Sequence, residues 1–506
     1  MSKRIAAAVQ FNPVHKDVEG NRARIVALAG EAADAGAGLI VFPEMATSGY
    51  VWTDREEISP YVEPIPGPTT NALVPVAKEK DCYVVIGLPE VDPTDNVYYN
   101  SAVLIGPEGV VGKYRKTHLF AADPRWAREG NDGFPVFETG IGRIGLLICM
   151  DAMYFEPARI LALQDADVIA FPTNWVGNGN NPPSKTWCLR ARENGVCWVA
   201  ANRSDAERGA QFTGGSAIIG PDGVPRQYLV SGEGIVYGEL LTDGAAKNRL
   251  RLSRKPEAYQ EILLHPYLWK EGETYASSGE PATFTIAVLP LGNEGGPGRQ
   301  IARHLAAIEP GNEQPVLAVV PEQTALNGDM EDYIRSLSAA AVDNGVYLAA
   351  AARGECFLLA PDGSLIGRSR QVHDCGGTGA ERYRVFMTPF GRVGLLTETD
   401  AKYPESYRVL AKYGADIIAI SGSRAEDNDV WMKRIWAFEN DAILALARPG
   451  GAAASLLFLH RQAALESDDG TPLIQTFNPD MTAVARSRPF MRRMKTHLYD
   501  LLVSRK

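Results

Sequence analysis

The residue with the clearest capacity for chemistry in this 506-residue chain is a cysteine that ends an apolar run. Cys149 follows residues 144–148, which predict a buried strand, and residues 150–163 carry an apolar stripe at helical spacing. A thiol at such a strand-to-helix turn lies near backbone N–H groups and the positive end of a helix dipole. Both favour a thiolate and can hold an oxyanion. The alternative is a buried structural thiol, because free cysteine is among the most buried residue types.

Two charged residues add the other groups that acyl transfer requires. Glu44 ends the apolar run 39–43, and Lys116 lies in the basic segment 112–119 beside a strand-like run. Acyl transfer by a thiol needs a nucleophile, a proton acceptor and a group that stabilises the tetrahedral intermediate. Cys149, Glu44 and Lys116 supply all three. Taken singly, Glu44 also fits a solvated charge at a strand end, and Lys116 fits a surface lysine.

In their order and setting these motifs resemble the nitrilase superfamily of carbon–nitrogen hydrolases, over roughly residues 4–265. The resemblance implies that Cys149 attacks a carbonyl or nitrile carbon and that Glu44 takes and returns protons. It also implies that Lys116 and a backbone N–H, such as that of Met150, stabilise the intermediate. The segments that carry the resemblance are Phe42–Glu44, Tyr114–Leu119, Cys149 with Asp151 and Glu156, Arg190–Asn194 and Phe212–Gly223.

Members of this superfamily often carry a second glutamate between the lysine and the cysteine, shortly before a glycine. By its spacing to Gly130, Asp123 is the closest match, although its side chain is one methylene shorter. Glu129 is the alternative, but it stands nearer to the glycine. We therefore assign Asp123 as the second carboxylate of the site.

The residues after the cysteine bear on the substrate. Met150 and Asp151 resemble the amidase and carbamoyl-hydrolase branches, whereas nitrile-hydrolysing members usually have Trp and Glu there. Members that act on N-carbamoyl amino acids tend to place arginines a few residues on, where this chain has Ala152 and Met153. A small neutral amide is therefore expected. The candidate substrate-binding residues, which could equally be packed at the core edge, are Tyr50, Trp52, Met150, Asn174 and Trp175.

The composition limits the kinds of partner and cofactor that the protein is expected to bind. With 45% hydrophobic and 22% charged residues the chain is typical of a soluble globular protein, and its net charge of −10 gives no reason to expect nucleic acid or an anionic membrane as partner. No apolar run is long enough to span a bilayer, and residues 1–4 precede no signal-like apolar region, so a cytoplasmic location is expected. The six cysteines form no C-x-x-C pair and the seven histidines are scattered, so no metal and no cofactor are expected.

The length exceeds that of one ordinary core, and the pattern of elements explains why. In the first half, strands alternate with helices and then run in hairpin-like pairs, which predicts a layered α/β domain. The resemblance implies four αββα layers that pair through their outer helices. We expect an active domain at 1–275, a linker at 276–282 and a second domain at 283–506, which together form an internal pseudo-dimer.

The second half repeats the first in degenerate form. Residues 317–322 repeat 39–44, residues 367–373 repeat 112–118, and residues 391–400 repeat 142–151. In these repeats Gln371 stands where the first half has Lys116, and Glu398 stands where it has Cys149. A carboxylate cannot replace a thiolate in ordinary amide hydrolysis, so this half is expected to be inactive.

We therefore predict a cofactor-independent thiol hydrolase that cleaves the C–N bond of a small neutral amide through a Cys acyl-enzyme. Two related alternatives use the same three residues, a nitrilase and an amide acyltransferase, and a homo-oligomer is possible for each. An alternative of a different class is a non-catalytic scaffold protein. Retention of all three residues in the first half alone argues against that last alternative.

Overall fold

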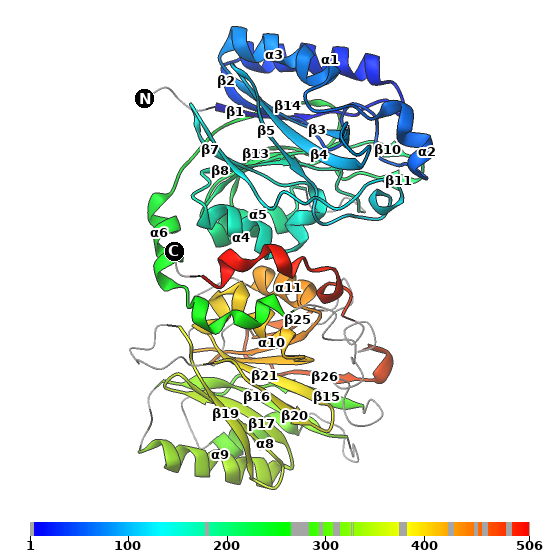
Figure 1. Ribbon diagram of the computed structural model, residues 1–506. Coiled ribbons are helices and arrows are strands. Elements are labelled where there is room, and N and C mark those ends of the chain that lie inside the picture. The colour runs from blue at the N-terminus through cyan, green and yellow to red at the C-terminus, as the bar shows by residue number, and fades with distance from the viewer. Residues whose placement is uncertain are drawn as a thin grey trace. The chain divides into compact units, whose positions relative to one another are not determined.

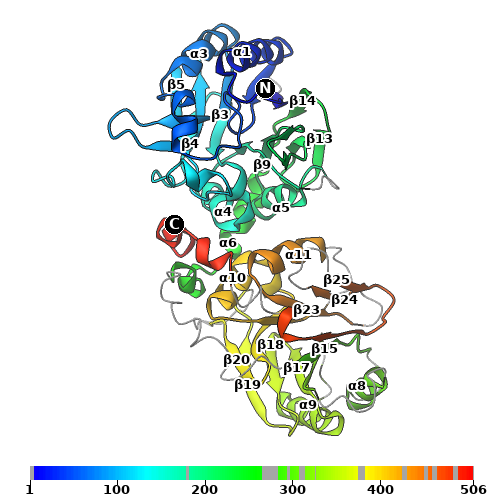
Figure 2. The same ribbon diagram turned by 90° about the vertical axis from the view of Figure 1, so that its right-hand side faces the viewer.

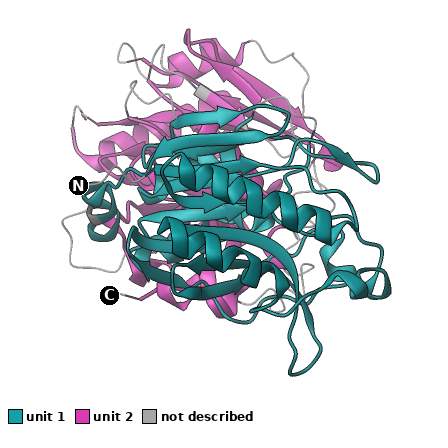
Figure 3. Cartoon of the chain, turned by 90° about the horizontal axis from the view of Figure 1, so that it is seen from above, with its two compact units in different colours: residues 1–252 teal, residues 253–506 magenta. Residues whose placement is uncertain are grey.

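The chain folds into two compact units, residues 1–252 and 253–506 (Figure 3). The predicted linker, 276–282, lies outside the described residues. Among the described helices, none has the length and apolar character needed to cross a membrane. The computed structural model describes residues 5–504 apart from 178–181, 265–282, 293–296, 307–313, 325, 327, 374–381, 424–429, 450–453, 458–463 and 482–487.

The first unit contains two six-stranded sheets that pack against each other. One has the order β14-β1-β2-β3-β4-β5, and the other has the order β13-β12-β9-β8-β7-β6. Each has three parallel central strands flanked by antiparallel ones. The strands are β1 (Ile5–Gln10), β2 (Ala37–Val41), β3 (Tyr83–Val91), β4 (Tyr98–Gly106), β5 (Gly109–Arg115), β6 (Val136–Thr139), β7 (Gly142–Leu146), β8 (Val168–Pro172), β9 (Cys197–Ala201), β12 (Ser216–Ile219), β13 (Pro225–Leu229) and β14 (Gly234–Glu239), with a small hairpin of β10 (Ala206–Glu207) and β11 (Ala210–Gln211).

Helices cover the outer face of each sheet, which gives the predicted αββα layers (Figures 1 and 2). On the first sheet lie α1 (Val18–Asp34) and α3 (Pro68–Lys80); on the second lie α4 (Phe155–Leu163) and α5 (Lys185–Asn194). The short α2 (Arg55–Ile58) and α6 (Gly244–Ser253) complete the helices of this unit. The outer helices bury their apolar stripes on the sheets, as Ile25, Ala29 and Ala32 do in α1.

The segment after the cysteine differs from the single helix expected over 150–163. It forms a 3₁₀ turn over Cys149–Met153, then Tyr154 adopts an extended conformation, and α4 begins at Phe155. Pro157 explains the break, because proline has no N–H and is tolerated only in the first turn of a helix. The helix therefore starts two residues before it.

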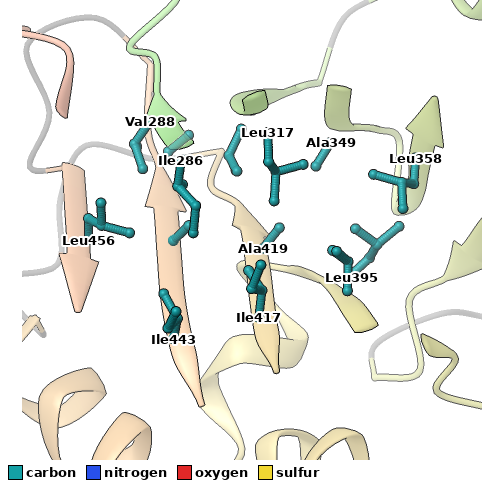
Figure 4. Packing of buried hydrophobic residues seen from close by; sticks show 14 of the residues in the cluster. Ile286, Val288, Leu317, Ala349, Leu358, Leu395, Ile417, Ala419, Ile443 and Leu456 are labelled. Atoms are coloured by element: carbon teal, nitrogen blue, oxygen red, sulfur yellow. The ribbon is translucent and has the colours of Figure 1, made fainter. Parts of the chain in front are cut away.

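The second unit has the same architecture, also with two six-stranded sheets, in the orders β19-β18-β17-β16-β15-β26 and β20-β21-β22-β23-β24-β25. Apolar side chains of both sheets interdigitate in its core, among them Leu317, Leu358, Leu395 and Ile443 (Figure 4). Its strands are β15 (Phe284–Val288), β16 (Val316–Gln323), β17 (Tyr347–Ala352), β18 (Glu355–Leu359), β19 (Leu365–Arg370), β20 (Val385–Thr388), β21 (Gly391–Thr397), β22 (Ile417–Ser421), β23 (Ile443–Ala447), β24 (Ala454–Leu457), β25 (Ala464–Ser467) and β26 (Leu473–Phe477), and its helices are α8 (Pro297–Leu305), α9 (Met330–Asn344), α10 (Pro404–Lys412) and α11 (Val430–Glu439).

The predicted internal repeat is confirmed strand by strand. The order β5-β4-β3-β2-β1-β14 of the first unit becomes β19-β18-β17-β16-β15-β26 in the second, and the other two sheets correspond in the same way. Each strand of the two six-stranded sheets therefore has a counterpart, which allows residue-by-residue comparison of the two units.

Candidate active site

The centre of the site is a buried lysine held between two carboxylates. Lys116 Nζ lies 2.7 Å from Glu44 Oε1 and 2.6 Å from Asp123 Oδ2. All three side chains are completely buried. A buried charge is tolerated only when it is paired and hydrogen-bonded, so this cluster fixes its members in one geometry.

Asn100, on β4, joins the two carboxylates from another side. Its Nδ2 donates to Glu44 Oε1 at 2.7 Å and to Asp123 Oδ1 at 3.3 Å. Its backbone carbonyl accepts the N–H of Lys116 at 2.8 Å. One residue thus contacts all three charged members of the cluster.

Glu44 is placed by a close approach of two strands. It lies just beyond the carboxyl end of β2. There the N–H of Gly87, on the neighbouring β3, donates to the carbonyl of Pro43 at 3.1 Å. A Cβ on Gly87 would lie 2.5 Å from Glu44 Cα, so only glycine fits. Asn174 holds the residue from the second sheet, since its backbone N–H donates to Glu44 Oε2 and its Nδ2 to the Glu44 carbonyl, each at 2.8 Å.

Cys149 lies just beyond β7 with a φ of +43°. A left-handed backbone is uncommon for a residue other than glycine and persists only where the surroundings impose it. The carboxylate of Asp151 spans this turn, because its Oδ2 accepts the Ile148 N–H at 2.9 Å. The same carboxylate accepts the Tyr114 hydroxyl at 2.8 Å and the His118 N–H at 3.1 Å. Asp151 thereby ties the cysteine turn to the segment that carries the lysine.

The charges of the cluster shift the pKa values of its members. Burial raises the pKa of the Cys149 thiol well above its usual range; the charge of Glu44 adds to this, and Lys116 opposes it. Burial likewise raises the pKa of Glu44 against the effect of Lys116, with Asp123 contributing to the rise. Burial alone would lower the pKa of Lys116, but Asp123 and Glu44 outweigh it and raise that pKa. These directions favour the charged form of the lysine and the protonated form of the thiol.

The structure separates the two candidates for the second carboxylate. Asp123 begins a short 3₁₀ turn, Asp123–Arg125, and is completely buried against Lys116. Its Oδ2 also accepts the Phe120 N–H at 2.9 Å. Glu129 is exposed to solvent. The shorter side chain of Asp123 thus reaches the lysine directly.

The predicted substrate-binding residues divide into two groups. Tyr50, Met150 and Asn174 lie around the cluster: the Lys116 ammonium lies 5.8 Å from the centre of the buried Tyr50 ring, and Met150 occupies the first 3₁₀ turn beside Cys149. Trp175 instead packs its ring against Phe171 and Trp187, with centroids 6.5 and 5.5 Å away. Trp52 is a core residue.

A buried carboxylate that the sequence did not single out anchors the loop carrying Tyr50. Glu207, on β10, accepts the N–H groups of Tyr50 and Val51 at 2.9 and 2.6 Å, and Arg203 donates to its other oxygen at 2.7 Å. Asn100 and Gly87 are two further residues that the sequence does not single out. Each lies within a run that predicts only a buried strand, and no neighbouring residue in the sequence indicates which side chain or strand packs against it.

Within the described part of the chain, no three side chains of the His, Cys, Asp and Glu types gather in a way that could hold a metal ion. The described cysteines are all free thiols.

The second unit replaces this cluster with an ion pair. Glu398, at the position of Cys149, accepts from Arg448 Nε at 2.8 Å and from Nη2 at 2.5 Å, and Arg448 is completely buried. Gln371, at the position of Lys116, donates to the His373 carbonyl at 2.6 Å. Glu322, the counterpart of Glu44, keeps its residue type. The segment that would hold a counterpart of Asp123 lies outside the described residues.

Comparison with known proteins identifies the family. The family model described as carbon-nitrogen hydrolase matches residues 5–241 and again 324–476, which is most of the chain. The chain belongs to the carbon–nitrogen hydrolase family. The two matched regions fall in the two units, so the repeat seen in the sheets is a repeat of the family domain.

Curated relatives correspond to about half of this carbon–nitrogen hydrolase. A nitrilase of Pyrococcus abyssi is 42% identical over 216 residues, covering 42% of this chain and 80% of the relative. A probable nitrilase of Schizosaccharomyces pombe is 34% identical over 51% of this chain and 97% of its own length. An omega-amidase of Xenopus laevis is 32% identical over 51% and 98%. The latter two relatives are therefore about as long as one unit.

Proposed function

We propose that the first unit hydrolyses the C–N bond of a small neutral amide through a thioester on Cys149. The observation that carries the proposal is the buried pairing of Lys116 with both Glu44 and Asp123 next to the turn of Cys149. This arrangement supports the proposal, because acyl transfer by a thiol requires a nucleophile, a proton acceptor and a stabilising positive charge, and Cys149, Glu44 and Lys116 have the side chains for these three roles.

The first half of the reaction follows from the pKa values. Because the thiol is protonated at rest, its proton must leave as Sγ attacks the carbonyl carbon, and Glu44 is the acceptor. The negative charge that develops on the carbonyl oxygen is stabilised by the Lys116 ammonium and by a backbone N–H of the Cys149–Met153 turn. Glu44 then gives the proton to the departing nitrogen, the C–N bond breaks, and a thioester remains.

The second half reverses these roles with water. Glu44 removes a proton from a water molecule, whose oxygen attacks the thioester carbon. The C–S bond then breaks, Glu44 returns the proton to Sγ, and the acid leaves. Asp123 supports both halves because it keeps Lys116 charged and in place. Its role is the positioning of the ammonium.

The charge of the site supports a neutral substrate. Lys116 already faces two carboxylates, so a substrate with its own carboxylate next to the reacting carbon would be repelled. The buried aromatic ring of Tyr50 adds an apolar wall. The sequence after Cys149 supports the same assignment: Met150 and Asp151 resemble the amidase and carbamoyl-hydrolase branches, and no arginine lies at positions 152–153 to bind a substrate carboxylate.

The test is intact-mass spectrometry of the full chain mixed with a panel of neutral aliphatic amides, acidic amides and nitriles. We expect an acyl adduct on Cys149 with neutral amides, together with release of ammonia or amine. Cys149→Ala is the control and should show no adduct. If nitriles alone acylate the thiol, the nitrilase alternative replaces the amidase; if an added amine captures the acyl group faster than water, the acyltransferase does. No adduct with any compound rejects the proposal.

A further inference from the structure

We propose that Asn100 is a positioning residue of the catalytic cluster, whose side-chain amide keeps Glu44 in its proton-accepting form. The inference rests on the proposed function of this site and extends it to a residue outside the Cys149, Glu44 and Lys116 set. Asn100 does not touch the reacting atoms in this argument. It acts through the carboxylate that does.

The geometry of the amide gives the first reason. Its NH₂ group has two hydrogens, and Nδ2 lies within hydrogen-bond distance of one oxygen on each of the two carboxylates, Glu44 and Asp123. Two carboxylates beside one ammonium repel each other, so a donor between them stabilises both charges. The hydrogen bond from Asn100 accordingly lowers the pKa of Glu44, against the larger rise that burial causes.

The other end of the same side chain gives the second reason. Asn100 is completely buried, yet its Oδ1 receives no hydrogen bond from any residue the structure describes. A buried carbonyl oxygen without a donor is costly, and a side chain that served only to stabilise the strand would be fully bonded. The donor end alone therefore explains why an asparagine stands here.

The second unit gives the third reason, independent of the first two. In the first unit the Lys116 N–H donates to the Asn100 carbonyl; in the second the Gln371 N–H donates to the Gly354 carbonyl at 2.7 Å, so Gly354 is the counterpart of Asn100. Gly354 lies in the two-residue turn between β17 and β18 with a φ of +77°, a conformation that favours glycine. The side-chain amide is thus absent from the unit in which Gln371 and Glu398 replace the lysine and the cysteine, although the backbone contact remains. The backbone contact is present in both units, and the amide is present only in the unit that has Cys149 and Lys116.

The test compares Asn100→Ala and the isosteric Asn100→Asp with Ser101→Ala, in the full-length protein. Ser101 is the matched control because it is the next residue of β4, is equally buried, and donates to a carboxylate, Glu90 Oε2 at 2.5 Å, outside the cluster. Two readouts are followed against pH. One is kcat/KM for a neutral amide that acylates the wild type, and the other is the rate of Cys149 alkylation by iodoacetamide, measured by peptide mass mapping.

Loss of the donor should raise the pKa of Glu44, so the acidic limb of both profiles should move to higher pH. The expected shift is about one pH unit or more for Asn100→Ala, the size of a lost hydrogen bond to a charged group, and larger for Asn100→Asp, which adds a third carboxylate. Ser101→Ala should lower the unfolding temperature without moving either limb.

Three outcomes decide the matter. A shift confined to the Asn100 variants supports the positioning role. Unchanged limbs in those variants, or equal shifts in Ser101→Ala, overturn it. Because alkylation needs no substrate, a wild type that hydrolyses no amide but shows the Asn100-specific shift rejects the proposed function while the positioning role stands.

Discussion

The two units share a turn that is fixed by an aspartate, Asp151 in the first and Asp400 in the second, and they differ in the other side chains of that turn. In the first, Asp151 accepts the His118 backbone N–H and lies 2.8 Å from His118 Nδ1, whose ring stacks on Tyr154. In the second, Asp400 makes the corresponding contacts with His373, at 2.9 and 2.8 Å, and His373 stacks on Tyr403. An aspartate that is kept in a unit with no cysteine at the position of Cys149 serves the fold, since it joins two strand ends in both units.

The differences fall on residues to which we assign a role in the proposed reaction. Cysteine becomes Glu398, lysine becomes Gln371 and Asn100 becomes Gly354, while the sheet order does not change. The left-handed backbone also disappears: Cys149 has a positive φ, whereas Glu398 is not among the described residues that do. The fold therefore does not require the strained turn, and only the unit with the nucleophile retains it.

The largest effect should come from Cys149→Ala. Removal of the nucleophile should reduce amide turnover on the order of 10⁴-fold or more, because no other group in the cluster can form the thioester. The measurement is ammonia release by the purified variant. Its free energy of unfolding should stay near that of the wild type, since one sulfur atom is removed. Near wild-type turnover would exclude the thiol mechanism.

Glu44→Gln and Lys116→Ala should follow. Each should lower kcat/KM by about 10²-fold or more, as expected for a positioned proton acceptor and an oxyanion-stabilising charge. In the wild type the rate should fall as the pH decreases through the raised pKa of Glu44, that is, at a higher pH than for an ordinary glutamate. Stopped assays across the pH range test both points. Losses of only a few-fold would remove these residues from the mechanism.

Glu398→Ala should lower stability and leave activity unchanged, the opposite of what we expect for Cys149→Ala. It leaves the buried Arg448 without its partner, which should destabilise the second unit by about 3–5 kcal/mol, while amide turnover stays unchanged. Hydrogen exchange of peptides from residues 391–448 measures the first effect. Replacing both partners by apolar residues is the control, and it should restore most of the stability. A fall in amide turnover with unaltered hydrogen exchange would show that the second unit contributes to catalysis, which would contradict the structural role assigned to Glu398.

The smallest effect should come from Gly87→Ala. The added Cβ meets the Glu44 backbone and should displace the carboxylate, with a loss of about 10-fold in kcat/KM. The second unit supplies the matched control, because Ala351 pairs directly with Glu322 there. Ala351→Gly should leave kcat/KM unaltered. Equal kinetics for Gly87→Ala and the wild type would show that the close approach does not set the position of Glu44.

Much of this protein can be predicted from sequence because the signals are local. Apolar periodicity and glycine positions predicted most strands and helices, and the repeated motifs predicted two like units, which the sheet orders confirm. Cys149, Glu44 and Lys116 lie at the ends of apolar runs that predict strands, where the side chains of neighbouring strands meet. Their catalytic roles stay predictions, although the structure places their side chains in one buried cluster.

Tertiary structure alone decided the rest. Asp123 and Glu129 are six positions apart in the same connecting segment. Only the tertiary structure shows that Asp123 is buried against Lys116 and that Glu129 is exposed. Asn100 and Gly87 look like ordinary strand residues until the partner strands are in place. The physical reason is that hydrogen bonds and close contacts across a sandwich join residues far apart in the chain, and no local periodicity encodes them.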